Sequence, residues 1–225
     1  THRINRSLQE TDGALGEHID ADIQRGTRAR VLGRWIDLGH THLYFLDRAI
    51  HHHGDLAGLR IRIAGGLANA ARLRGLGAEP VLVAWPDLPQ ALSDGEIDGL
   101  LTSHVTVASA RLWELGVNHA FEDRQYFARY VPLVAASFWQ RLPEELQLLI
   151  TDTWEEGVAS ARDTATSAQA RARETLQSHD IRIVSPPATA LRHWRRRLLA
   201  VQPSLVEELG IDPALVALAR EALDE

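Results

Sequence analysis

Cysteine and methionine are both absent from the 225 residues of the chain. Without cysteine there is no thiol nucleophile, no disulfide and no thiolate metal site, and an oxidising compartment is permitted but not required. Long apolar runs are also missing, since none approaches the roughly 20 residues that span a bilayer. Positive charge is in deficit, with a formal net charge of −6, so we expect no broad nucleic-acid-binding face.

The signature motifs of common enzyme classes are missing as well. The chain has no Gly-x-Ser-x-Gly elbow, no P-loop and no glycine-rich dinucleotide fingerprint. Its composition, 45% hydrophobic and 24% charged, is ordinary for a globular protein. Because catalysis has no positive signal, we expect neither an enzyme nor a cofactor.

The most informative stretch runs from Asp55 to Thr102. Short apolar segments alternate there with helical ones, in the order strand, helix, strand, helix, strand. This alternation predicts an α/β fold with a parallel or mixed sheet flanked by helices. Further strands are expected at 29–36, 43–46, 125–128 and 130–135.

A long helix is predicted from Pro143 to Ser178, where apolar or small residues recur at helical spacing. Pro143 suits a first helical turn, and the two glutamates after it suit the positive end of the helix dipole. A helix of this length would extend roughly 54 Å, more than one small lobe needs. We therefore expect it to brace two lobes. A short strand at 181–184, a helix at 189–209 that Pro203 must kink or break, and a last helix from Pro213 follow.

Arg62 is the sharpest candidate for a binding residue. It closes an expected strand, Leu59 to Ile63, just before a glycine-led helix. An arginine at the carboxyl end of a strand can bind a carboxylate bidentately, although a surface arginine paired with an acid fits the spacing equally well. Trp85 ends the next strand and could wall a ligand site or fill the core. Thr102 offers a hydroxyl after the third strand.

Histidines cluster at His40 and His42 and again at His51-His52-His53. The alternation of His40 and His42 places both on one face of a strand, which suits zinc geometrically. A carboxylate that would support these ligands by hydrogen bonding to their rings cannot be placed from the sequence, however, and the triple histidine beside Gly54 has the pattern of an exposed turn. We therefore predict no metal site.

Several motifs occur together in an order and at separations that resemble one known family. They are Asp37-x-Gly39, Asp55-Leu56-x-Gly58-Leu59-x-Ile61-Arg62, Gly77-Ala78-x-Pro80-Val81, Trp85, Ala91-Leu92, Asp98-Gly99, Trp113-Glu114 and Phe138-Trp139-x-x-Leu142-Pro143. The family is the extracytoplasmic solute receptors of tripartite ATP-independent periplasmic (TRAP) transporters, of the dicarboxylate- and sialate-binding type. The resemblance covers nearly the whole chain from about Gly13.

The resemblance implies a two-lobed, type II periplasmic-binding-protein architecture. Residues 1–40 with 130–142 would be what remains of the first lobe, 41–129 the ligand-binding second lobe, 143–178 the bridging helix and 179–225 a C-terminal strand and helices. Such a receptor is exported to the periplasm by a signal peptide that is not in this chain. It binds a small organic acid and delivers it to the small and large TRAP membrane subunits, without nucleic acid or direct membrane insertion.

The resemblance also assigns positions in the binding site. Arg62 takes the place of the carboxylate-binding arginine, and Trp85 that of the aromatic lining the cleft. Thr102 stands where these receptors usually carry an asparagine. Thr41, or His42 if the register slips by one, replaces a second arginine, and Arg124 falls near a polar cleft residue.

These departures predict the ligand. Leu100 and Leu101 replace a polar pair just before Thr102. Each charged hydrogen bond to a ligand contributes on the order of 1.5 to 3 kcal/mol, so the loss of an arginine and two polar groups should change specificity. We expect a monocarboxylate or a less polar acid rather than a sugar acid rich in hydroxyls.

Two further expectations concern the start of the chain and the class of protein. Family members begin with strands and helices of the first lobe, which this chain enters late, so it is either a fragment or a receptor with a reduced lobe. The alternative classes are an α/β enzyme, metal-dependent through His40 and His42, and a ligand-sensing domain.

Overall fold

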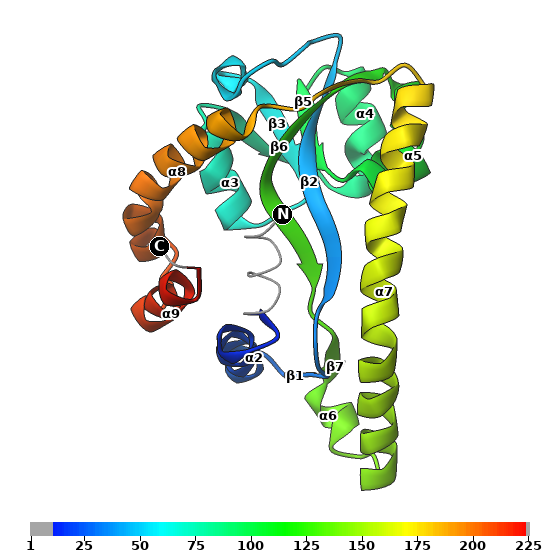
Figure 1. Ribbon diagram of the computed structural model, residues 1–225, viewed down its shortest axis with the longest axis vertical. Coiled ribbons are helices and arrows are strands. Elements are labelled where there is room, and N and C mark those ends of the chain that lie inside the picture. The colour runs from blue at the N-terminus through cyan, green and yellow to red at the C-terminus, as the bar shows by residue number, and fades with distance from the viewer. Residues whose placement is uncertain (1–10, 224–225) are drawn as a thin grey trace. The chain divides into compact units, whose positions relative to one another are not determined.

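The computed structural model describes residues 11–223 (Figure 1). These residues form two compact units. Within the described range, the first unit comprises 11–38, 129–165 and 210–223, and the second 39–128 and 166–209. No helix in this range is long and apolar enough to cross a bilayer.

The second unit is built on a six-stranded mixed sheet. Its strands, in spatial order, are β4 (Glu79–Leu82), β3 (Arg60–Ile63), β5 (Gly99–Thr102), β2 (Ile36–Leu46), β6 (Val117–Tyr130) and β8 (Arg182–Val184). β3 runs parallel to β4 and β5, whereas β2 runs antiparallel to β5. Pro80 lies on the edge strand β4, where its missing N–H disturbs the ladder least. The predicted α/β alternation is therefore confirmed.

Helices cover both faces of this sheet (Figure 1). Leu43 and Phe45 of β2 pack with α3 (Leu67–Gly75) and α8 (Ala188–Glu208) in one core cluster. Tyr44, between them, belongs to a second cluster with α4 (Leu88–Ser93) and α5 (His104–Ser109). Successive strand residues point to opposite faces, so each face has its own core.

Short helical turns complete the second unit, namely η1 (His53–Leu56), η2 (Trp85–Asp87) and η3 (Leu112–Leu115). Gly99 opens β5 at a point where no side chain fits. A Cβ there would lie 2.6 Å from the carbonyl oxygen of Tyr44 and from the ring of Phe45. Glycine thus permits the close approach of β5 to β2.

The first unit is mainly helical. It contains α2 (Ala14–Gly26), a two-stranded sheet of β1 (Ala29–Val31) and β7 (Leu133–Ala135), α6 (Ala136–Trp139), α9 (Pro213–Leu223) and the first part of α7 (Glu144–Ser178). Arg162 of α7 pairs with Asp12 at 2.6 Å and with Asp37 at 3.3 Å. An apolar groove of about 540 Å³ runs along α7, lined by residues such as Leu149 and Trp154.

The predicted long helix is confirmed as α7, which has 35 residues. The strand predictions at 29–36 and 43–46 were wrong in their bounds. β1 ends at Val31, and β2 is one strand of 11 residues, Ile36–Leu46, that includes the polar run Gly39 to His42. Tertiary burial, rather than apolar alternation, holds that run in the sheet. Pro203 does not end α8, which continues to Glu208.

Candidate functional site

Arg62 lies on β3 with only 3% of its surface exposed. Its Nε donates a hydrogen bond to the carbonyl of Val83 at 3.0 Å, and no carboxylate among the described residues pairs with it. Burial lowers its pKa, yet an arginine remains charged at any physiological pH. A buried cation without a counter-ion is costly, so this guanidinium is suited to an anion from outside the chain.

Arg60, two residues earlier on the same face, gives the contrast. It is bound by Asp98 through both the backbone N–H and the guanidinium, at 2.8 Å each. The alternative of a surface arginine paired with an acid therefore describes Arg60 and is wrong for Arg62.

Trp85 begins η2 and remains 45% exposed, so the alternative of a core tryptophan is wrong. The guanidinium carbon of Arg62 lies 5.6 Å from the centroid of its indole, within the range of a cation–π contact. The two residues that the sequence singled out at this sheet edge thus lie against each other.

Strand register places three candidates on one face of the sheet. Arg62 pairs with Leu100, and Thr102, two residues further along β5, pairs with His42 of β2. Register partners share a face, and so do residues two apart on one strand. Arg62, Thr102 and His42 therefore lie on the same face, and Thr41 points away from it. The Thr41 hydroxyl instead donates to the carbonyl of Tyr126 at 3.4 Å.

Arg124 lies on β6 and already has an acidic partner. Its Nη2 donates to Oε2 of Glu122 at 2.9 Å, and its side chain is 51% exposed. Arg124 thus helps to hold a buried carboxylate, a role that its position in the sequence did not indicate.

Glu122 is a residue that the sequence analysis missed, and it is 1% exposed. It accepts hydrogen bonds from four side chains, at distances of 2.6 to 3.2 Å: Ser185, Arg173, Arg124 and His104. Burial raises its pKa, but the hydrogen bonds outweigh this and hold the pKa far below its usual range. Glu122 is therefore ionised at any physiological pH.

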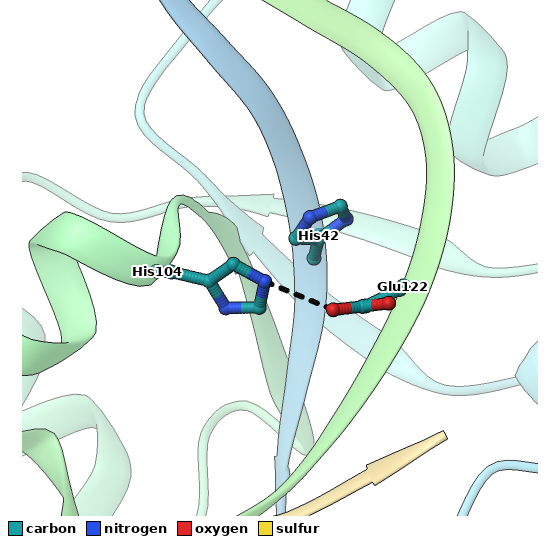
Figure 2. Close-up of side chains that lie close together, drawn as sticks. All are labelled: His42, His104 and Glu122. Carbon is teal, nitrogen blue, oxygen red and sulfur yellow. Dashed lines mark hydrogen bonds and ion pairs between the residues drawn. The ribbon is translucent and has the colours of Figure 1, made fainter. Parts of the chain in front are cut away.

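His104, at the start of α5, connects Glu122 to the core. Its Nδ1 shares a hydrogen bond with the hydroxyl of Tyr44 at 2.7 Å, and its Nε2 lies 3.2 Å from Oε1 of Glu122. The ring of His42 packs against it, with centroids 4.5 Å apart (Figure 2). Burial, and then the neighbouring His104, lowers the pKa of His42 to about 3, so this imidazole is neutral.

Among residues 11–223, these three side chains form the only cluster of three metal-binding groups. His42, which was weighed with His40 as a zinc ligand, is one of them, but its partners are His104 and Glu122. The ring of His40 instead stacks on His42 at 6.3 Å and packs edge-on against Phe127. The carboxylate of the cluster is thus provided by β6.

The predicted exposed turn at His51-His52-His53 is wrong for its last member. His53 is fully buried between the rings of Phe121 and Trp194. The turn of η1 carries it inward while His51 and His52 stay exposed. Burial, followed by the charge of Arg72, lowers the pKa of His53 to about 4.

Residues 5–208 match the family described as bacterial extracellular solute-binding protein, family 7. The chain belongs to this family. The resemblance inferred from the motifs is thereby confirmed, and the family consists of solute-binding receptors rather than enzymes.

Two curated relatives are each 23% identical to the chain. One is the C4-dicarboxylate-binding periplasmic protein of Rhodobacter capsulatus, matched over 164 residues, 70% of this chain and 47% of the relative. The other is a solute-binding protein of Chromohalobacter salexigens, matched over 72% of this chain and 51% of the relative. The chain therefore spans about half the length of the curated relatives it matches.

Solved structures of TRAP periplasmic solute-binding proteins share the fold. The protein from Desulfovibrio salexigens with bound orotic acid matches with a TM-score of 0.89 at 17% identity, over 98% of this chain and 70% of its own. The protein from Ralstonia eutropha with bound (S)-2-acetolactate matches with a TM-score of 0.84 at 20% identity, over 95% and 68% respectively. The expected periplasmic-binding-protein fold is confirmed.

Proposed function

We propose that this chain binds a small organic acid by its carboxylate and, as part of a periplasmic receptor, delivers it to the small and large membrane subunits of a TRAP-type transporter. The single observation that carries the proposal is the guanidinium of Arg62, buried and without a carboxylate partner in the described part of the chain. An anionic ligand would supply the missing counter-charge in a bidentate geometry that suits a carboxylate.

The surroundings of Arg62 favour a monocarboxylate or another acid with few hydroxyls. Two exposed apolar side chains follow the carboxyl ends of β3 and β4, Leu67 at 71% and Trp85 at 45%. Ligands of open α/β sheets bind outside the carboxyl ends of the strands, and apolar side chains exposed there would cover a hydrocarbon body better than a sugar. Thr102 and the neutral ring of His42, on the same face, offer uncharged hydrogen bonds.

We assign the second unit, with residues 41–129 at its centre, to the ligand-binding lobe. Residues 1–40 and 130–142 are assigned to the first lobe, 143–178 to the helix shared between lobes and 179–225 to the C-terminal strand and helices. Arg62 and Trp85 would contact the ligand directly, with Thr102 and His42 beside them. Thr41 and Arg124 remain candidates of lower rank, because each already has a partner within the chain.

The test is a thermal-shift screen of organic acids, followed by calorimetry of the best acid against two matched variants. Loss of a charged hydrogen bond pair should weaken binding about 10- to 100-fold in Arg62→Ala. Arg60→Ala removes an arginine that Asp98 already occupies, so its affinity should stay within about twofold of the parent chain. Equal losses in both variants would reject Arg62 as the anchor. Tighter binding of D-glucuronate than of short monocarboxylates would reject the ligand class.

A further inference from the structure

We propose that His42, His104 and Glu122 bind a divalent first-row metal cation, for which zinc is the best match. One ligand atom from each residue lies within 4.8 Å of the others (Figure 2). All three side chains are at least 95% buried. Two imidazoles and one carboxylate that leave a fourth position open are a ligand set that zinc accepts. The inference goes beyond the proposed carboxylate site, with which it shares His42 but not the anchor Arg62, and its test does not use the organic acid.

The spacing of the first two ligands already fits a metal. His104 Nε2 and Glu122 Oε1 are 3.2 Å apart. Two ligands held about 2.0 to 2.1 Å from a tetrahedral zinc ion are separated by about 3.3 Å. A cation can therefore replace the proton between these atoms with almost no movement of either side chain.

His42 is free to become the third ligand. Its Nδ1 is buried and has no hydrogen-bond partner among the described residues, so a small rotation of the ring breaks no bond at that atom.

Neighbouring residues support the ligands as they do in zinc proteins. The Tyr44 hydroxyl lies 2.7 Å from Nδ1 of His104, so it can accept a hydrogen bond from that nitrogen when a metal replaces the proton on Nε2. Ser185 donates to Oε2 of Glu122 at 2.6 Å, so the carboxylate is oriented from the side opposite the histidines. A ligating carboxylate is itself usually hydrogen-bonded in this way.

Two arginines beside Glu122 limit the affinity of the site for a cation. Arg124 and Arg173 both pair with Glu122, at 2.9 and 2.7 Å, so one carboxylate faces two guanidinium groups before any cation arrives. Both arginines are more than one-third exposed, and water screens part of their repulsion. A cation at this position should therefore recruit an anion as its fourth ligand, and removal of one arginine should strengthen binding.

The experiment is a zinc titration by calorimetry on the full chain after treatment with a chelator, with cobalt(II) absorption as a probe of tetrahedral coordination. The parent chain should bind one equivalent and give an intense cobalt spectrum. His42→Ala and His104→Ala should each lose at least tenfold in affinity, whereas His40→Ala, on the same strand face, should bind as the parent does. No stoichiometric binding, or equal binding by all three variants, would overturn the site.

Two further variants separate this site from surface binding and from misfolding. The double variant His51→Ala/His52→Ala removes exposed histidines and should leave the cobalt spectrum unchanged; loss of the signal there would assign the metal to the surface. Arg124→Gln keeps Arg173 and Ser185 on Glu122 and should tighten zinc binding severalfold. Unchanged or weaker binding in Arg124→Gln, with an unaltered circular dichroism spectrum, would remove Glu122 from the ligand set.

Discussion

Buried carboxylates have different surroundings on the two faces of the central sheet, and adjacent residues of β6 show the difference. Glu122 points to one face and accepts four side-chain hydrogen bonds. Asp123 points to the other face, where Arg72 at 2.7 Å is its ion-pair partner. Burial raises the pKa of Asp123 despite that arginine, whereas the pKa of Glu122 is far below its usual range. The balance between burial and the hydrogen bonds and charges that oppose it therefore decides the sign of each shift.

The two faces also differ in whether their buried polar groups have partners within the chain. On the face of Asp123, His53 is enclosed by Phe121 and Trp194, and the whole cluster is packed into the core. On the face of Glu122, Arg62 lacks an acid and Nδ1 of His42 lacks a hydrogen bond within the described chain. On the face of Asp123, buried atoms of His53, Arg72 and Asp123 also lack a hydrogen bond within the described chain, but the arginine there has an acidic partner. Both proposals rest on the face of Glu122.

Removal of Arg72 should have the largest effect on stability. The Asp123 carboxylate is fully buried, and Arg72 is the arginine that pairs with it among residues 11–223, so its removal leaves an uncompensated charge. Arg72→Ala should therefore lower the free energy of unfolding by about 3 to 5 kcal/mol. Arg124→Ala, which removes a half-exposed arginine from the well-supplied Glu122, should cost under about 1 kcal/mol. Urea denaturation of both variants measures the two free energies of unfolding. Similar decreases in both variants would contradict the proposed difference between the faces.

His53 should make its face sensitive to acid. Its pKa falls from an ordinary value of 6.5 to about 4 on folding, so between these values the unfolded chain binds more protons than the folded one. The stability is present above pH 6.5 and is lost as the pH falls toward 4, by about 3 kcal/mol. His53→Phe should abolish this part of the loss, while His51→Phe, at an exposed position, should not. Unfolding free energies at pH 7 and pH 4 that fall equally in the parent and in His53→Phe would contradict the assignment.

The sequence predicted those features of the structure that depend on residues close together in the chain. Helical spacing from Pro143 to Ser178 is a repeating signal, and α7 follows it to within one residue. The strand that ends near Arg62 is likewise encoded by a short run of neighbouring residues. Such signals need no knowledge of the partner strand. The strand expected to end at Trp85 instead ends at Leu82, and Trp85 begins a separate turn.

The Glu122 cluster could not be predicted, because it depends on contacts between distant segments. His42, His104 and Glu122 come from β2, α5 and β6, and meet only after β2 pairs with β5 and lies beside β6. His104 follows the Thr102-Ser103 pair at a helix start, a signal that marks a helix but not a partner. For Glu122, one acid within a polar strand carries no local signal at all.

Replacement of Arg62 should change the free energy of unfolding in the opposite direction from replacement of Arg72. Because Arg62 is buried without a counter-ion among residues 11–223, Arg62→Met replaces an uncompensated charge by an apolar side chain of similar length. We expect the free energy of unfolding of the unliganded chain to rise by about 1 kcal/mol, while affinity for the organic acid falls. Denaturation without ligand, combined with calorimetry, separates the two effects. A loss of stability comparable to that of Arg72→Ala would show that Arg62 has a structural partner.

Trp85 should have the smallest effect on folding, because nearly half of its surface is exposed. Its contact with the Arg62 guanidinium is worth about 0.5 to 1 kcal/mol at such a site, so Trp85→Ala should lower stability by no more than that. Ligand affinity should fall severalfold, and Trp85→Phe should restore most of it, because a flat apolar ring would again cover the hydrocarbon part of the acid. If Trp85→Ala instead unfolded the chain, the indole would belong to the core of the unit. The surface beside Arg62 that a ligand can contact would then be smaller than the exposure of Trp85 indicates.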